Sequence, residues 1–144
     1  RIFKERYKLD GIRIVHHTEF IDELIAQGRL RVSAGDRTYV YHDPCELGRG
    51  CGIYEQPRNV LRHAGTLVEA AKNRRESICC GGSVGSLSLG LDKRRVMTEN
   101  ALSNLTVASP DVIVTACPLC LNTFARYADR KVEDLAETVD RNTA

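Results

Sequence analysis

Five of the six cysteines in this chain form a pattern that is typical of metal binding. Cys45 is followed by 33 intervening residues and then by the adjacent Cys79 and Cys80, and 36 residues later comes the motif Cys117-Pro-Leu-Cys120. Thiolates in this number are ligands of soft transition-metal centres, above all iron-sulfur clusters and zinc. Cys51 lies outside the pattern, and we interpret it as a free thiol. The other five cysteines predict a metal centre.

Each cysteine group taken alone has an interpretation without metal. The Cys117–Cys120 pair is also typical of a thioredoxin-like dithiol or of two buried core cysteines. The adjacent Cys79–Cys80 pair does not match zinc-finger spacing, which usually takes two C-x-x-C-type pairs. Gly81 and Gly82 follow it directly and provide a backbone free to wrap closely around a bulky inorganic group. The combination of three groups favours a metal centre over the alternatives.

The composition is that of an ordinary globular domain. The 144 residues carry a net charge of +2 and only 6% aromatic residues, which gives no support for nucleic-acid binding. No apolar run approaches the roughly 20 residues of a membrane span, and the N-terminus lacks the layout of a signal peptide. Six cysteines are too few for a secreted disulfide scaffold of this length. We therefore expect a cytoplasmic domain without a transmembrane segment or a nucleic-acid partner.

Apolar runs alternate with helical patterns along the chain. Strands are expected at Ile12–His17, at Thr38–Tyr41, in a weaker run ending at Ser77-Ile78, and at Asp111–Ala116. Helices are expected from Thr18 or Glu19 to Gly28, from Pro57 to about His63, from about Leu91 to Val107, from near Pro118 through Tyr127, and in the tail after Asp129. The segment from Thr66 to Ala71 is ambiguous.

This alternation predicts an α/β fold with a small parallel sheet flanked by helices. The carboxyl ends of parallel strands lie on one edge of the sheet, where α/β proteins place their sites. Each of the three cysteine groups follows the end of an expected strand. We therefore expect the cysteine site at the carboxyl edge, with His16 and His17 facing the same edge from the end of the first strand.

Two cysteine groups also lie where helices are expected to begin. Asp43 is a suitable N-cap and Pro44 suits the first helical position, so Cys45 should lie in or beside a first helical turn. Backbone N–H groups and the helix dipole favour thiolate over thiol there. Other residues are candidates for a second layer of contacts around the site: His17, His42, Arg49, Gly81 and Gly82. For the two histidines a plain structural role is the favoured alternative.

Three segments together resemble a known family. They are His42-Asp-Pro-Cys45, Cys79-Cys-Gly-Gly82 and Cys117-Pro-Leu-Cys120. They look like the cysteine-rich CCG domain of the catalytic B subunit of heterodisulfide reductase. Similar domains occur in iron-sulfur subunits of glycolate oxidase, anaerobic glycerol-3-phosphate dehydrogenase and lactate-utilisation proteins. The likeness runs from about Val40 to Phe124. It implies a [4Fe-4S] cluster, cubane or noncubane, with five ligands: Cys45, Cys79, Cys80, Cys117 and Cys120.

The same resemblance implies an iron-sulfur redox domain of a larger oxidoreductase. Such a domain relays electrons or delivers them to a disulfide or thiol substrate, in the cytoplasm or peripheral to the membrane within a complex. Its partners would be other domains or subunits, such as a flavoprotein or a ferredoxin-like protein. Family members generally carry two repeats, so we expect this chain to be the C-terminal part of a longer protein. Residues 1–37 would form a strand-helix unit and linker within the domain, and residues 38–144 the CCG domain.

Two other functions are compatible with the residues. The first is a zinc-stabilised structural or partner-docking module on the same fold, which would be redox-silent. The second is a metal-free thiol-disulfide exchanger that uses Cys117 and Cys120. Colour separates the iron-sulfur protein from both, and metal content separates these two from each other.

Overall fold

The strands form a parallel sheet at the centre of the molecule. The computed structural model describes residues 6–7, 10–82 and 86–143. Its four-stranded sheet has the order β2-β1-β3-β4, and every neighbouring pair is parallel. The strands are β1 (Thr38–His42), β2 (Thr66–Val68), β3 (Val112–Thr115) and β4 (Lys131–Asp134). This confirms the predicted fold class.

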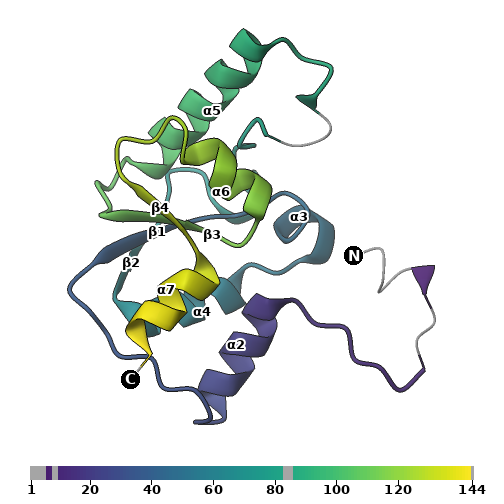
Figure 1. Cartoon of the computed structure of the whole chain (residues 1–144), viewed down its shortest axis with the longest axis vertical. Coiled ribbons are helices and arrows are strands. Elements are labelled where there is room, and N and C mark those ends of the chain that lie inside the picture. The colour runs from purple at the N-terminus through teal and green to yellow at the C-terminus, as the bar shows by residue number, and fades with distance from the viewer. Residues whose placement is uncertain (1–5, 8–9, 83–85, 144) are drawn as a thin grey trace.

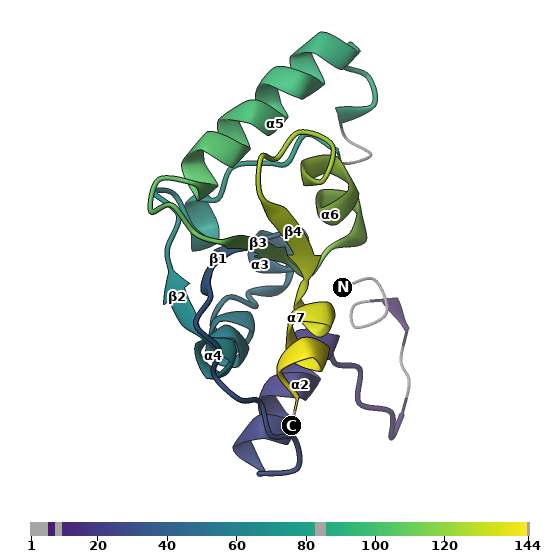
Figure 2. The ribbon, with the colours of Figure 1, turned by 60° about the vertical axis from the view of Figure 1, so that its left-hand side comes forward.

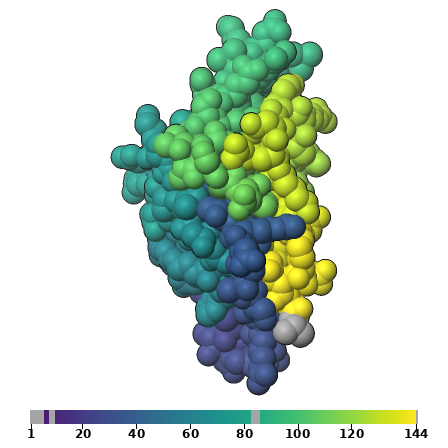
Figure 3. Space-filling model, turned by 90° about the vertical axis from the view of Figure 1, so that its left-hand side faces the viewer, coloured from purple at the N-terminus to yellow at the C-terminus, as the bar shows by residue number. Residues whose placement is uncertain are grey.

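Helices cover both faces of the sheet (Figure 1). One face carries α4 (Glu55–Ala64) and α7 (Leu135–Asn142), with α2 (His17–Ala26) packed against them. The other face carries α5 (Leu91–Leu105) and α6 (Pro118–Phe124). Two short helical segments, α3 (Gly48–Cys51) and the 3-10 helix η1 (Arg74–Glu76), lie in the connections. In the side view, α5 forms one end of the molecule and α2 the opposite end (Figure 3).

The central strands are buried on both faces, which explains their nearly continuous apolar sequences. Alternate side chains point to opposite faces of a strand. Tyr41 and Val114 belong to the core under α4 and α7, whereas Val40 and Ile113 belong to the core under α5 and α6. Cys80 and Cys120 are part of this second core.

The register aligns the carboxyl ends of three strands. His42 of β1 pairs with Thr115 of β3, which pairs with Asp134 of β4. The chain therefore leaves these strands from one edge of the sheet. That edge is the expected location of the site.

The strand expected at Ile12–His17 is wrong. Residues 12–16 have no strand partner in the described structure, and the Ile12 side chain is 63% exposed. His16 is instead the N-cap of α2: its Nδ1 accepts the Thr18 N–H, and its own N–H donates to the Glu19 carboxylate. This capping box begins the helix at the point where the alternating pattern indicated a strand.

The strand expected to end at Ser77-Ile78 is also wrong. The ambiguous segment supplies the strand instead, as β2 (Thr66–Val68). Before Cys79 the chain forms η1 and then an irregular stretch. The Arg49 guanidinium donates to the Arg75 carbonyl in η1 and to the Ser77 carbonyl directly after it. The Arg49 side chain thus binds backbone carbonyls that a neighbouring strand would bind if this segment were in the sheet.

The C-terminal tail holds a strand as well as the expected helix. Residues 131–134 form β4 before α7 begins at Leu135. The other expected helices occur within a few residues of their predicted limits. Gly28 follows α2 with a φ of 67°, the left-handed conformation in which glycine commonly ends a helix. None of the helices described here is long and apolar enough to cross a bilayer.

Candidate metal centre

The carboxyl edge of the sheet brings several cysteine side chains together. Cys117 and Cys120 flank the beginning of α6, directly after β3. Cys79 and Cys80 lie at the same place, at the end of the irregular segment after η1, although no strand comes directly before them. The Sγ atoms of Cys80 and Cys120 lie 3.2 Å apart, with the Cys120 thiol donating. Thus two groups separated by 36 residues in the sequence meet in space.

The clustered sulfurs shift each other's proton affinity. The pKa of Cys80 is lowered, mainly by hydrogen bonds from Cys120 and Cys79. The hydrogen bond from Cys120 likewise lowers the pKa of Cys117 to about 6. The pKa values of Cys79 and Cys120 are raised, because their thiol protons are held in these hydrogen bonds and because both groups are shielded from water. Thiolate is the form that binds metal, and the cluster already favours it at two positions.

Cys45 lies beside the same group. It follows β1 in a turn, is half-buried, and is close enough to Cys79 to contribute to the raised pKa of that thiol. The helix expected to begin at Pro44 begins only at Gly48, so Cys45 lies in the turn before α3. The structure therefore gathers all five cysteines of the sequence pattern around one region of the sheet edge.

Two glycine amides point at cysteine sulfurs. The Gly81 N–H donates to the Cys79 Sγ at 3.5 Å, and the Gly82 N–H donates to the Cys80 Sγ at 3.4 Å. Gly81 has a φ of 80°, which side-chain-bearing residues rarely adopt. At Gly82 a Cβ atom would lie 1.9 Å from the Oγ1 of Thr123. Both positions need glycine, one for its backbone angle and the other for close packing against α6.

We expect Gly82→Ala to damage the site through this contact with Thr123. The added methyl group would push the Cys79–Cys80 segment away from α6, at a cost of about 1–3 kcal/mol in the free energy of unfolding. Urea denaturation measures the loss. Because Thr123→Ala removes the clashing oxygen, the double variant should recover most of the stability, and an equally destabilised double variant would contradict this explanation.

The two histidines expected near the site have different surroundings. His42 is buried at the end of β1, with its ring edge-on to Phe124 at 4.7 Å between centroids. Burial lowers the pKa of His42 to about 4, so the ring is neutral at pH 7, and the largest opposing effect on this pKa comes from the charge of Cys80. The Nε2 of His17 lies 3.9 Å from a carboxylate oxygen of Asp134, and no described hydrogen bond joins His17 to a cysteine. The structure thus brings His42, and not His17, to the cysteines.

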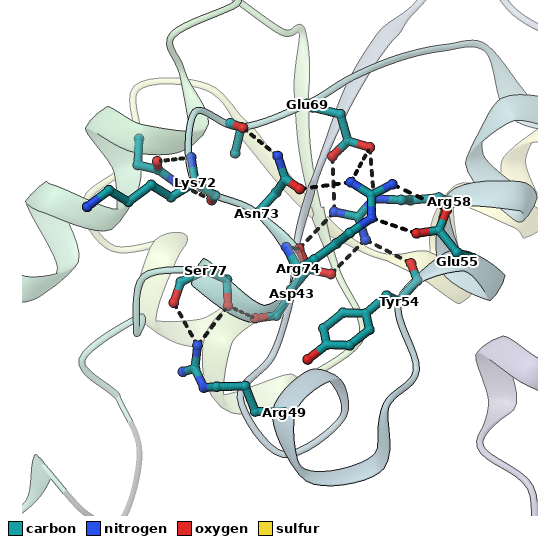
Figure 4. Close-up of polar contacts among 12 residues, drawn as sticks. Asp43, Arg49, Tyr54, Glu55, Arg58, Glu69, Lys72, Asn73, Arg74 and Ser77 are labelled. Carbon is teal, nitrogen blue, oxygen red and sulfur yellow. Dashed lines mark hydrogen bonds and ion pairs between the residues drawn. The ribbon is translucent and has the colours of Figure 1, made fainter.

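Asp43 has a different role from the expected N-cap. Its carboxylate forms a bidentate ion pair with Arg58 of α4, at 2.7 and 2.8 Å (Figure 4). Arg58 is fully buried, and its remaining donors bind the Glu69 carboxylate and the Tyr54 carbonyl. All five N–H groups of the guanidinium are therefore used. The Asp43 carboxylate thus binds Arg58 and does not cap a helix.

This network joins the two loops that carry Cys45 and Cys79. The second carboxylate oxygen of Asp43 also accepts the Arg74 N–H at 2.6 Å. Ser77 donates its hydroxyl to the Asp43 carbonyl, and Arg49 donates to the Ser77 carbonyl at 2.9 Å. Arg49 thus acts on the loop backbone, two residues before Cys79, and no described hydrogen bond joins it to a sulfur.

Sequence reasoning did not assign a role to the Arg58 ion pair, although a signal was present. Arg58 lies three residues before Leu61, on the buried face of α4 that also includes Pro57 and Ala64. A charged side chain on an apolar helix face needs an opposite charge. The carboxylate of Asp43, after the end of a strand, was an available partner.

Cys51 packs on a different core from Cys80 and Cys120. It is the last residue of α3, is half-buried, and packs against the core on the α4 side of the sheet. All six cysteines are free thiols. That Cys51 lies outside the site remains a prediction.

The donor set at the sheet edge fits an iron-sulfur group. Its ligands would be thiolates, and the amides of Gly81 and Gly82 supply the N–H···S bonds that adjust such centres. Within the described residues, no group of three or more His, Cys, Asp or Glu side chains is arranged to hold a single metal ion.

The cysteine segments match a known family model and several curated proteins. The model of the CCG cysteine-rich domain matches residues 39–125. An EtfAB:quinone oxidoreductase of Syntrophomonas wolfei is 37% identical over 143 residues, which cover 88% of this chain and 20% of that protein. One component of the dihydromethanophenazine:CoB–CoM heterodisulfide reductase of Methanosarcina acetivorans is 34% identical over 131 residues, or 85% of this chain and 32% of that component.

A third relative is the probable iron-sulfur-binding oxidoreductase FadF of Bacillus subtilis. It is 30% identical over 145 residues, which cover 96% of this chain and 21% of that protein. The chain thus spans about a fifth to a third of the length of these relatives.

Proposed function

Because the chain belongs to the CCG cysteine-rich domain family, we propose that it is an iron-sulfur redox domain that passes electrons within a larger oxidoreductase. The observation that carries the proposal is the meeting of the cysteine groups at the carboxyl edge of the sheet, with the Sγ atoms of Cys80 and Cys120 3.2 Å apart. The family and its iron-sulfur relatives support iron and sulfide over other metals.

The proposed ligands come from three separate segments of the chain. An iron-sulfur cluster supplies one-electron transfer at a potential that its ligands and surroundings set. Four thiolates complete the ligand set of a cubane [4Fe-4S] cluster, and a fifth permits a noncubane form or leaves one sulfur free. The proposed ligands are Cys45, Cys79, Cys80, Cys117 and Cys120.

The residues around the sulfurs would adjust the charge and water content of the site. The amides of Gly81 and Gly82 donate to sulfur and so stabilise thiolate charge. His42 is uncharged at pH 7, and its ring contacts Phe124, which packs in the same core as Cys80 and Cys120. Arg49 positions the loop before Cys79 by donating hydrogen bonds to the carbonyls of Arg75 and Ser77.

The electrons would come from, or go to, other domains or subunits of the oxidoreductase. We propose a flavoprotein or a ferredoxin-like iron-sulfur protein as that partner, and a disulfide or thiol as a terminal substrate where the domain is catalytic. The heterodisulfide reductase named among the relatives supports the disulfide alternative. Ile21 and Ile25 of α2 pack on the same core as α4 and α7, which supports placing residues 1–37 in the same domain.

The test is the metal content of anaerobically purified protein. We expect about four iron and four or more acid-labile sulfide per chain, with a brown chromophore. An EPR spectrum of the same sample distinguishes the cubane from the noncubane form. About one zinc per chain without colour, persisting after iron-sulfur reconstitution, would contradict the proposal and indicate the structural module instead.

Cys51→Ser should leave the iron-sulfur centre intact. Cys51 packs against the core under α4 and α7 and lies outside the proposed ligand set. Iron content, sulfide content and the visible spectrum should match those of the unmodified chain. If this single change emptied the site, the proposed ligand set would be wrong.

A further inference from the structure

A surface of arginines and apolar side chains lies between α5 and α6. Residues three or four apart share one face of a helix, so Leu91, Arg94, Arg95 and Thr98 form a stripe along α5. A second stripe runs along α6 and the turn after it, and both helices lie on the same side of the sheet (Figure 2). We call these two stripes the α5–α6 face; the second consists of Leu119, Thr123, Arg126 and Tyr127.

A small hollow opens between the two stripes. It has a volume of about 90 Å³, and Gly81 forms part of its wall. Pockets for drug-sized ligands measure roughly 300–1,000 Å³, so this hollow suits a single side-chain group. Gly81 directly follows Cys80, and Leu119 lies between Cys117 and Cys120. The α5–α6 face therefore borders the proposed redox centre.

Two of the three arginines on this face are not paired with a carboxylate in the part of the chain that the structure describes. Arg95 forms an ion pair with Glu99 at 2.7 Å. Arg94 donates from Nε to the Gly81 carbonyl at 3.2 Å, which leaves its charge uncompensated. Among the residues that the structure describes, neither Arg94 nor Arg126 has an ion-pair partner. Two guanidinium groups beside the hollow are thus available to a carboxylate.

Apolar side chains on the same face are unusually exposed. Leu91 is 79% exposed, Leu119 is 49% exposed and Tyr127 is 46% exposed. The centres of protein interfaces are enriched in aromatic side chains and arginine, and exposed apolar patches with polar rims often mark such interfaces. The combination on this face is therefore suited to a protein partner.

We infer that the α5–α6 face docks a redox protein whose contact surface is acidic, with one of its carboxylates entering the hollow between Arg94 and Arg126. The inference rests on the proposed function, because electrons must enter or leave the centre through a neighbouring surface. Opposite charge on the partner would speed its encounter and fix its orientation. The apolar side chains would then exclude water from the contact.

The test uses a reduced acidic [2Fe-2S] ferredoxin as the electron donor for the cluster-loaded chain. We expect its second-order rate constant, measured by stopped-flow absorption, to fall with rising salt. Arg126→Glu should lower this rate constant at low salt by about tenfold or more, because it reverses a charge at the docking face. A rate constant that is insensitive both to salt and to this variant would overturn the inference.

The matched control is Arg62→Glu, which makes the same charge change on α4, on the other side of the sheet. It should stay within about twofold of the unmodified chain, since rim charges act locally. Equal losses in both variants would show an effect of net charge alone and would overturn the inference. A zwitterionic viologen without net charge should reduce all three proteins at the same rate.

A binding measurement separates this inference from the proposed function. Titration of oxidised ferredoxin into the chain, followed by calorimetry, reports docking whether or not a cluster is present. Binding that Arg126→Glu abolishes and Arg62→Glu preserves would support the docking face. A chain that binds ferredoxin in this way but contains no iron would contradict the proposed function alone.

Discussion

Cys80→Ser is expected to abolish the iron-sulfur centre. Cys80 is buried and well connected in the proposed site: it accepts from the Cys120 thiol at 3.2 Å, neighbours Cys79, and accepts the Gly82 amide. A serine hydroxyl is a harder ligand that is hardly ionised at pH 7, so it replaces a thiolate poorly. Iron and sulfide analysis of anaerobically purified protein should show loss of essentially all bound iron.

The expected loss must be separated from unfolding. Serine is nearly the same size as cysteine, so the far-UV circular dichroism of Cys80→Ser should remain that of a folded α/β protein. Cys51→Ser is the matched control, because it makes the same change at a cysteine outside the site. Full iron and sulfide content in Cys80→Ser would remove Cys80 from the proposed ligand set.

The sequence predicted the fold best where burial alone determines an element. The strands β1 and β3 are buried on both faces, so their apolar and β-branched residues are a sufficient signal. The run at residues 12–16 has a similar pattern but stays outside the sheet. Its alternation is a property of the local sequence. A strand must also pair with the edge of another strand, and the local pattern does not show whether such an edge is available.

The strand β4 was not predicted, because most of its residues are charged. The strand reads Lys131-Val-Glu-Asp134, with one apolar residue, yet the Glu133 side chain is 1% exposed. Lys131 and Arg141 each lie 2.6 Å from its carboxylate, which offsets the cost of burying it. A rule that equates buried strands with apolar residues cannot find a strand whose buried position is an ion pair.

The sequence predicted that cysteine groups meet at the sheet edge, but not which side chains hold their loops there. The spacing of cysteines and the rule that sites lie at carboxyl edges were enough to bring Cys80 and Cys120 together. The approach of Cys79 along a loop was not predicted, because that loop is held by side chains distant in sequence. Arg49 and Asp43 form those contacts, with loop residues 28 and 31 positions further along the chain.

Arg58→Met is expected to lower the free energy of unfolding by about 3–5 kcal/mol, since it leaves the buried Asp43 carboxylate without its bidentate partner. Glu69 is one-third exposed and can be hydrated instead. Asp43 also holds the Arg74 N–H and lies two residues before Cys45, so bound iron should decrease as well. Urea denaturation and iron analysis measure the two effects.

Two further variants test whether the unpaired charge is the cause. Arg62→Met changes an exposed arginine one turn further along α4, whose described hydrogen bond goes to Asn59, and should alter stability by less than about 0.5 kcal/mol. The double variant Asp43→Leu with Arg58→Met removes both charges and should be more stable than Arg58→Met alone. Recovery will be partial, because the Arg74 N–H also loses its acceptor. A double variant no more stable than the single one would assign the cost to lost packing of the Arg58 side chain, and not to a buried unpaired carboxylate.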